Sequence, residues 1–157
     1  MPYQGIQPQE NREFISSVGN WAGDITWDPG PILGLYGLGK ISTDPYPDIK
    51  TAQLSYPYSR VRRCRDTRFT INIAKPSGYA VCKARLRISD GILSYVRAWA
   101  TIVIEWNWVG LGLSQTIPGA FDVLNTKIYV DVQSNSDTSG TTVFIDLASI
   151  DEVSYKG

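Results

Sequence analysis

The sequence predicts an all-β protein built as a sandwich of two antiparallel sheets. Apolar and polar residues alternate with a period of two in four segments, namely residues 67–73, 80–88, 96–104 and 128–132. No segment repeats its apolar residues at the spacing of an amphipathic helix. Glycine and proline, with 14 and 9 residues among 157, separate the alternating segments. With shorter candidates included, eight or nine strands are expected, and this number favours two packed sheets.

The remaining elements follow in chain order. Residues 1–9 show no apolar pattern, so we expect an extended N-terminal arm followed by one β-sandwich domain over residues 10–157. Further short strands are expected at residues 12–17, 24–27, 49–55 and 141–153. Residues 28–40 are rich in glycine and proline and are expected to form a loop. This loop carries five large apolar residues, which are Ile32, Leu33, Leu35, Tyr36 and Leu38.

Composition argues against catalysis. The chain is long enough for one domain with a sizeable core, and it contains no histidine. Histidine-based triads, cysteine–histidine dyads and histidine metal sites are therefore excluded. The usual general base near neutral pH is also missing, so we expect no enzyme and no cofactor. The most apolar stretch, residues 92–113, is interrupted by Arg97 and Glu105, so we expect no membrane partner.

Charge is unevenly distributed along a chain whose net charge is zero. Residues 1–59 carry −3, residues 60–97 carry +8 and residues 98–157 carry −5. One interpretation is a basic sheet face in contact with water, and another is a basic surface that meets an acidic surface of a second copy or partner. Nucleic acid is not an expected partner, because the basic run lacks interleaved aromatic residues.

The two cysteines are expected to be free thiols. The N-terminus lacks the basic start and apolar run of a secretory signal, which suggests synthesis in the cytoplasm. Cys82 alternates with core-facing residues and should be buried. Cys64 lies between Arg63 and Arg65, whose positive charge would favour its thiolate if it is exposed.

Exposed aromatic residues are candidates for stacking on sugar rings. By strand parity, Tyr95 and Trp99 face away from the core, whereas Trp106 faces inward. Solvent-facing aromatic side chains on a sheet either stack on sugars or are covered by a neighbouring subunit. The candidate glycan-stacking residues are Tyr56, Tyr58, Tyr95, Trp99 and Trp108.

The last strand and the first element resemble those of a known family. Phe144, Ile145 and Asp146, followed by Ser149, resemble the closing strand of jelly-roll carbohydrate-binding modules. The segment 11–14 with Trp21 resembles the opening element of these modules. The resemblance implies a galactose-binding-like β-sandwich with jelly-roll topology, a fold also used in bacteriophage structural proteins.

The resemblance also implies where a structural calcium ion would bind. In that family, acidic residues beside the opening phenylalanine and in the closing strand contribute ligands. Here Ile15 and Leu147 occupy those positions. Asp146 alone cannot hold calcium, so we expect no metal.

Two functions are carried forward from the sequence. The favoured hypothesis is a virion structural protein, such as a capsid decoration (cement) protein or a tail or fibre component, made in the host cytoplasm. It rests on the absence of a signal sequence, on a chain that stands alone, and on the arm and the apolar loop. These two segments would contact a second copy or a capsid or tail protein, giving a homo-oligomer or a docked subunit. The alternative is a secreted or cell-surface carbohydrate-binding module; a hydrolytic enzyme is the least favoured reading.

Overall fold

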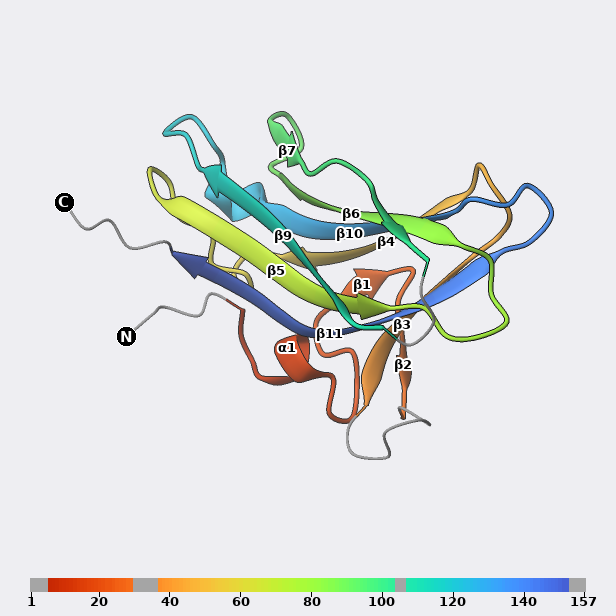
Figure 1. The fold of residues 1–157 in the computed structure, drawn as a ribbon. Helices are drawn as coiled ribbons and strands as arrows, with labels where there is room; N and C mark the ends of the chain where they lie inside the picture. Colours follow the sequence, from red (N-terminus) through yellow and green to blue (C-terminus); the bar gives the residue numbers. More distant parts are fainter. Residues whose placement is uncertain (1–5, 30–36, 104–106, 153–157) are drawn as a thin grey trace.

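A six-stranded and a five-stranded antiparallel sheet stack face to face (Figure 1). The computed structural model describes residues 6–29, 37–103 and 107–152. The first sheet, here the β10 sheet, has the order β1 (Ala22–Gly23), β4 (Ile49–Ser55), β10 (Lys127–Ser134), β6 (Cys82–Ser89) and β7 (Ser94–Val96), with β8 (Ala100–Ile102) also paired to β6. The second, the β11 sheet, has the order β2 (Thr26–Asp28), β3 (Leu38–Thr43), β11 (Thr141–Glu152), β5 (Asp66–Ala74) and β9 (Val109–Thr116). The predicted jelly-roll β-sandwich is thereby confirmed.

The core lies between the two sheets and follows the predicted alternation. Phe69, Ile71 and Ile73 of β5 are fully buried and face the fully buried residues of the other sheet. From the β10 sheet these are Ala52, Leu54, Ala84, Leu86, Ile88, Ile128, Val130 and Val132. Truncating one such large aliphatic side chain to alanine costs about 2–5 kcal/mol. The core therefore fixes which side of each strand faces solvent.

The strand expected at residues 12–17 is wrong. Arg12 and Glu13 belong to a single helical turn, α1 (Glu10–Glu13), and residues 14–17 lie in no strand. The Glu10 carboxylate accepts hydrogen bonds from the backbone N–H groups of Ser16 and Ser17, both at 2.7 Å. Local side-chain to backbone bonds of this kind compete with strand pairing.

Asn11 explains why the opening element carries an asparagine. Its side chain is fully buried, and its Oδ1 accepts the backbone N–H of Asn20 at 2.5 Å. Its backbone carbonyl accepts the indole N–H of Trp21 at 2.8 Å. Gly19 has φ +58°, and a Cβ there would lie 2.2 Å from the Asn11 Oδ1. Asn11 therefore holds the chain between α1 and β1.

The extended arm expected over residues 1–9 is corrected for residues 6–9. Ile6 has no exposed surface and belongs to the core, and the backbone N–H of Gln7 donates to the Tyr58 carbonyl at 2.8 Å. The packed domain therefore includes Ile6, because burial of this side chain stabilises the segment against the sandwich. Residues 1–5 lie outside the described residues.

The loop expected at residues 28–40 is shorter than predicted. Asp28 ends β2 and Leu38 begins β3, and these two residues pair with each other. Leu38 is only 7% exposed, so it belongs to the sandwich and offers no interface surface. The other four interface candidates, Ile32, Leu33, Leu35 and Tyr36, lie outside the described residues.

The single strand expected at residues 96–104 is interrupted. β7 ends at Val96 and β8 begins at Ala100, and both pair with β6. Between them the Arg97 side chain donates to the carbonyls of Gly112 at 3.1 Å and Ala98 at 2.8 Å. The interruption shifts the parity, so Val96 is 48% exposed although it was expected to face the core. Trp106 lies outside the described residues.

The cysteines are free, with Cys64 exposed and Cys82 buried, as predicted. Burial raises the pKa of the Cys82 thiol above its ordinary value. No helix in the described part of the chain has the length and apolar character that a membrane crossing requires.

Candidate functional site

The outer surface of the β10 sheet carries the largest set of long polar and aromatic side chains. Because strands alternate, every second residue of β4, β6 and β10 points away from the core. We call this surface the polar face. It comprises Thr51, Gln53, Lys83, Arg85, Arg87, Trp99, Lys127, Tyr129, Asp131 and Gln133.

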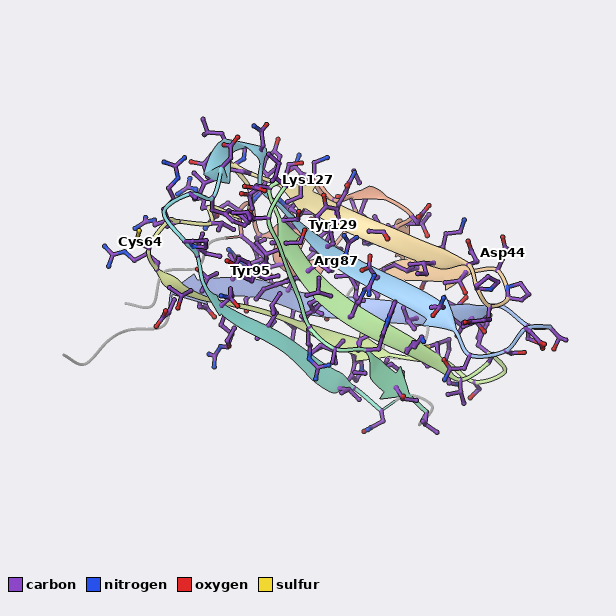
Figure 2. All side chains as sticks on the ribbon, turned by 90° about the horizontal axis from the view of Figure 1, so that it is seen from above. Asp44, Cys64, Arg87, Tyr95, Lys127 and Tyr129 are labelled. Carbon is purple, nitrogen blue, oxygen red and sulfur yellow. The ribbon has the colours of Figure 1, made fainter. Side chains whose placement is uncertain are left out.

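Strand register arranges these residues in rows across the sheet. Arg85 lies opposite Asp131, which lies opposite Thr51. Trp99 precedes Ala100, the partner of Ala84, and so extends this row next to Arg85. The adjacent row contains Arg87, Tyr129 and Gln53. Figure 2 shows Arg87 and Tyr129 side by side on β6 and β10, viewed onto this face.

Asp131 organises the two arginines. One carboxylate oxygen accepts Nε of Arg85 at 2.8 Å and Nε of Arg87 at 2.6 Å. The other accepts Nη2 of Arg87 at 2.9 Å and the Thr51 hydroxyl at 2.7 Å. The Asp131 side chain is 1% exposed, whereas Arg85 and Arg87 are 28% and 25% exposed. Asp131 is thus a positioning residue, and the guanidinium groups remain within reach of a ligand.

The charge state of Asp131 follows from the same contacts. Burial alone would raise its pKa, but hydrogen bonds from Arg87, Arg85 and Thr51 outweigh burial and lower the pKa below its ordinary value. The carboxylate therefore stays ionised at neutral pH and keeps both arginines in place.

The two aromatic rings of the face are each paired with cations. The Arg85 guanidinium carbon lies 4.3 Å from the centre of the Trp99 ring system, and Lys83 Nζ lies 5.1 Å from it. The Arg87 guanidinium carbon lies 4.2 Å from the centre of the Tyr129 ring. Cation–π contacts of this kind contribute about 0.5–2 kcal/mol and fix the orientation of both partners.

The structure separates the five aromatic residues that the sequence grouped as glycan-stacking candidates. Trp99 alone lies on the polar face. Tyr58 and Tyr95 pack against the core, and Tyr95 stacks on buried Phe121 with ring centroids 6.0 Å apart. Tyr95 therefore faces inward, opposite to its predicted orientation, because it lies opposite core residue Ile88. Tyr56 lies in the loop after β4, and Trp108 lies directly before β9 of the other sheet.

Sequence reasoning missed Tyr129 as a site residue. The signal was present, since Tyr129 alternates with the buried Ile128 and Val130 and shares its parity with Asp131. What the sequence does not show is that β10 pairs with β6, so that Tyr129 and Arg87 become neighbours.

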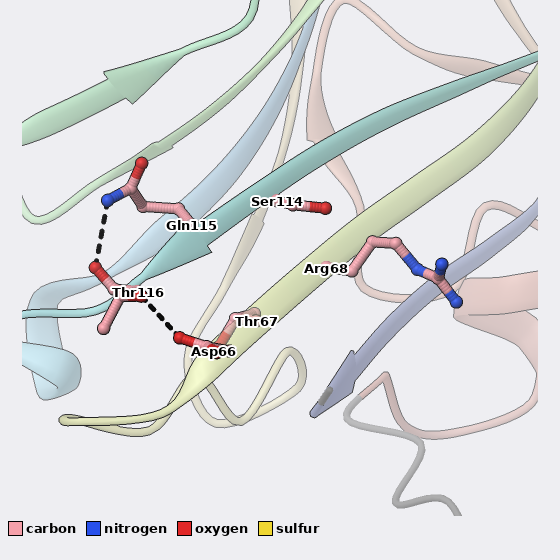
Figure 3. A pocket seen from close by; sticks show the side chains of 6 residues that line it. All are labelled: Asp66, Thr67, Arg68, Ser114, Gln115 and Thr116. Carbon is pink, nitrogen blue, oxygen red and sulfur yellow. Dashed lines mark hydrogen bonds between the residues drawn. The ribbon is translucent and has the colours of Figure 1, made fainter. Parts of the chain in front are cut away.

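A hollow lies at one end of β5 and β9, on the β11 sheet. It has a volume of about 530 Å³ and is lined by Asp66, Thr67, Arg68, Ser114, Gln115 and Thr116 (Figure 3). The Thr116 hydroxyl donates to the Asp66 carboxylate, so this acid already has a partner. The lining contains no aromatic ring, and small hydroxyl side chains on an open surface give a ligand little apolar area. We therefore regard the polar face as the stronger candidate.

A second pocket of about 240 Å³ lies where the structural calcium of the resembled family would be expected. It is lined by Gln9, Glu13, Ile15, Asp146 and Leu147. Ile15 and Leu147 are 41% and 54% exposed. Among the described residues, no three acidic, cysteine or histidine side chains lie close enough together to hold a metal ion. Burial, with a further contribution from Glu13, raises the pKa of Asp146 to about 6. The two carboxyl groups of this pocket, Glu13 and Asp146, fall short of the about six to eight oxygen ligands that calcium takes, and Ile15 and Leu147 supply no further side-chain oxygen.

Comparison with solved structures places the fold. The CBM22-1 xylan-binding domain of Paenibacillus barcinonensis Xyn10C superposes with a TM-score of 0.66 at 11% identity, over 92% of this chain and 93% of that domain. The two share the jelly-roll β-sandwich fold. The CBM22-1–GH10 modules of Clostridium thermocellum endo-1,4-β-D-xylanase 10B, complexed with xylohexaose, give a TM-score of 0.69 at 11% identity. That match covers all of this chain and 30% of the two-module structure.

A bacteriophage protein has a similar domain. The enzymatically active domain of bacteriophage CBA120 tailspike protein 4 gives a TM-score of 0.60 at 12% identity, over 96% of this chain and 21% of that one. The sequence matches no protein-family model and no curated protein sequence. Identities this low relate the chain to these proteins in fold alone.

Proposed function

We propose that this protein is a non-catalytic carbohydrate-binding module that binds a glycan on the polar face. The observation that carries the proposal is the presence of two aromatic rings, Trp99 and Tyr129, on one solvent-facing sheet surface among hydrogen-bonding side chains. Aromatic rings bury the apolar faces of sugars, while nearby polar groups satisfy the hydroxyls.

A sugar would stack on the parts of the two rings that the arginines leave uncovered. The rings are held by Arg85 and Arg87, and both arginines are held by Asp131. Ordering a long side chain on binding costs about 0.5–1.5 kcal/mol, and a surface already ordered avoids that cost. Gln53, in the same row as Tyr129, offers both an amide donor and a carbonyl acceptor to a sugar hydroxyl.

The test is binding of soluble polysaccharides, measured by affinity gel electrophoresis and titration calorimetry. Trp99→Ala and Tyr129→Ala should each weaken binding about tenfold or more, because each removes a stacking surface. Tyr79→Ala is the matched control, since Tyr79 is an exposed aromatic residue in the turn before β6, away from the two rows. Unchanged binding in both face variants, with the fold intact by circular dichroism, would refute the proposal.

A virion structural role, favoured by the sequence, is the second candidate. The tailspike domain supports it in fold only, and four of its five interface residues lie outside the described residues. It predicts a stable homo-oligomer or a complex with a capsid or tail protein, and no glycan binding. Size-exclusion chromatography with light scattering separates this role from a monomeric glycan-binding module.

A further inference from the structure

The polar face has an excess of positive charge. Lys83, Arg85 and Arg87 follow one another on the outward side of β6, and Lys127 lies on the neighbouring β10. Among the described residues of this face and its β1 edge, the carboxylates are those of Asp131 and Asp24. Asp131 is covered by the arginines, and Asp24 accepts the backbone N–H of Thr51 at 3.0 Å. A ligand on this face therefore meets cations before it meets carboxylates.

The arginines keep unused donors. Arg85 donates to Asp131 through Nε alone, and Arg87 through Nε and one Nη. A guanidinium has five N–H donors in a planar fork that suits a carboxylate. Within residues 6–29, 37–103 and 107–152, the hydrogen bonds of the two guanidinium groups to Asp131 use neither terminal nitrogen of Arg85 and only one Nη of Arg87, and both side chains are about a quarter exposed.

A neutral ligand would leave these groups poorly satisfied. Covering a partly exposed cation removes water from it, and this desolvation is unfavourable unless an opposite charge or a strong acceptor replaces the water. The positive groups lie directly beside the stacking rings, within 4.2–5.1 Å of their centres. Any sugar stacked on Trp99 or Tyr129 therefore lies next to them.

We infer that the glycan recognised on the polar face is acidic, carrying uronic-acid carboxylates that pair with Arg85, Arg87 and Lys83. The inference rests on the proposed glycan-binding function and narrows its ligand class. Trp99 and Tyr129 supply stacking, and the three cations of β6 supply selection for the acid. Asp131 contributes by holding the two guanidinium groups in register.

The experiment compares one polysaccharide backbone with and without its charge. Polygalacturonate and its highly methyl-esterified form differ only in the ionised carboxylates, and neutral xylan serves as an uncharged reference. We expect polygalacturonate to bind about tenfold or more tightly than the methyl ester, as charge-assisted hydrogen bonds provide. The preference should decrease as sodium chloride is added, since salt screens these exposed pairs.

Two variants test the residues. In Arg85→Gln, Asp131 keeps its hydrogen bonds to Arg87 and Thr51. In Lys83→Gln, the hydrogen bonds of Asp131 are all kept, because Lys83 is not among its partners. Both should reduce binding of polygalacturonate several-fold and reduce binding of the ester by less, so that the preference for the acid form falls. Arg68→Gln removes the same charge from the exposed surface of β5 on the other sheet and should have no effect.

Each outcome decides. Preference for the acid form, lost in Arg85→Gln or Lys83→Gln and kept in Arg68→Gln, supports the inference. Equal binding of both forms overturns it while the glycan-binding function stands. If Arg68→Gln weakens polygalacturonate binding as much as the two face variants do, the attraction is non-specific and the inference is overturned. Dextran sulfate, a sulfated polysaccharide, is a further probe. If the protein binds it and does not bind polygalacturonate, the assignment of carboxylates as the recognised groups is overturned. Binding to none of these polysaccharides, neutral xylan included, would count against the glycan-binding function itself.

Discussion

Asp131 and Asp146 lie on the outward sides of β10 and β11, one on each sheet, and their pKa values shift in opposite directions. Burial acts on both carboxyl groups and raises the pKa. At Asp131, hydrogen bonds from Arg87, Arg85 and Thr51 outweigh burial and lower it. At Asp146, burial dominates, Glu13 adds to it, and the pKa rises to about 6. Two outward-facing aspartates, one on each sheet, thus have pKa values on opposite sides of the ordinary value.

The outer surfaces of the two sheets also differ in the side chains that they present. On the β10 sheet the outward positions carry arginine, lysine, tyrosine and tryptophan. On β9 of the other sheet, the outward residues are Gly110, Gly112, Ser114 and Thr116. The outward residues of each strand therefore set which chemistry each outer surface offers to a ligand.

The largest expected effect is on the Asp131 side. Asp131→Ala leaves Arg85 and Arg87 without their shared carboxylate, and breaking a buried ion pair of this kind should lower the free energy of unfolding by about 3 kcal/mol. Chemical denaturation at pH 7 measures this change. Asp151→Ala on β11 is the control, and it should cost less than about 1 kcal/mol. An equal loss in both variants would contradict the distinction between the two sheets.

The opposite sign is expected at Asp146. Its folded pKa of about 6 lies above the unfolded value of 3.8, so the folded state binds more protons and stability falls as pH rises from about 4 to 6. Asp146→Asn should raise the free energy of unfolding at pH 7 by about 1 kcal/mol, after allowance for solvent screening.

The same denaturation series separates the two aspartates by pH. The lowered pKa of Asp131 gives stability that is present above pH 3.8 and is lost as pH falls further. Between pH 4 and 7, Asp146→Asn should therefore flatten the pH dependence. A variant that keeps the slope of the parent protein would show that Asp146 titrates normally.

A smaller gain is expected on the glycine-containing strand. A Cβ at Gly112 would lie 3.6 Å from the nearest atom, the Thr70 Cγ2, which is an ordinary contact. Gly112→Thr should stabilise the protein by about 0.5 kcal/mol, because threonine favours extended backbone and glycine does not. Glycan binding should not change. A thermal melt measures the stability, and the calorimetric titration measures glycan binding. A loss of binding in this variant would indicate that the glycan binds on the β11 sheet and not on the polar face.

The smallest expected effect is that of metal removal. Since Ile15 and Leu147 line the pocket beside Asp146, chelation with EDTA should move the thermal midpoint by less than about 1 °C. A fall of more than about 5 °C that calcium restores would reveal a metal site at this end of β11.

The sandwich was predictable because period-two alternation survives wherever a strand covers the core. Residues 67–73, 82–88 and 128–132 all lie in observed strands with the predicted side inward, whereas residues 80 and 81 precede β6. The prediction was wrong where local contacts compete with the pattern. Glu10 bonds to the backbone after α1, and the interruption after Val96 reverses the orientation of Tyr95.

The candidate site was less predictable than the fold. Each residue of the polar face belongs to a recognisable alternating segment, but Arg85 and Asp131 are 46 residues apart. Their contact depends on β6 and β10 being neighbours, and alternation within one strand carries no information about its neighbours. Trp99 was identified from parity alone, whereas Tyr129 needed the register.

Arg97, which lies between β7 and β8, also contacts the outermost strand of the β11 sheet. β9 is the outermost strand of its sheet, and an outermost strand offers unpaired backbone groups to which another chain can add. The Arg97 guanidinium occupies the Gly112 carbonyl on that strand. A long, charged side chain over an otherwise smooth glycine-containing edge opposes end-to-end sheet growth and amyloid-like stacking. The same arginine that interrupts the predicted strand thus covers one backbone acceptor of this outermost strand.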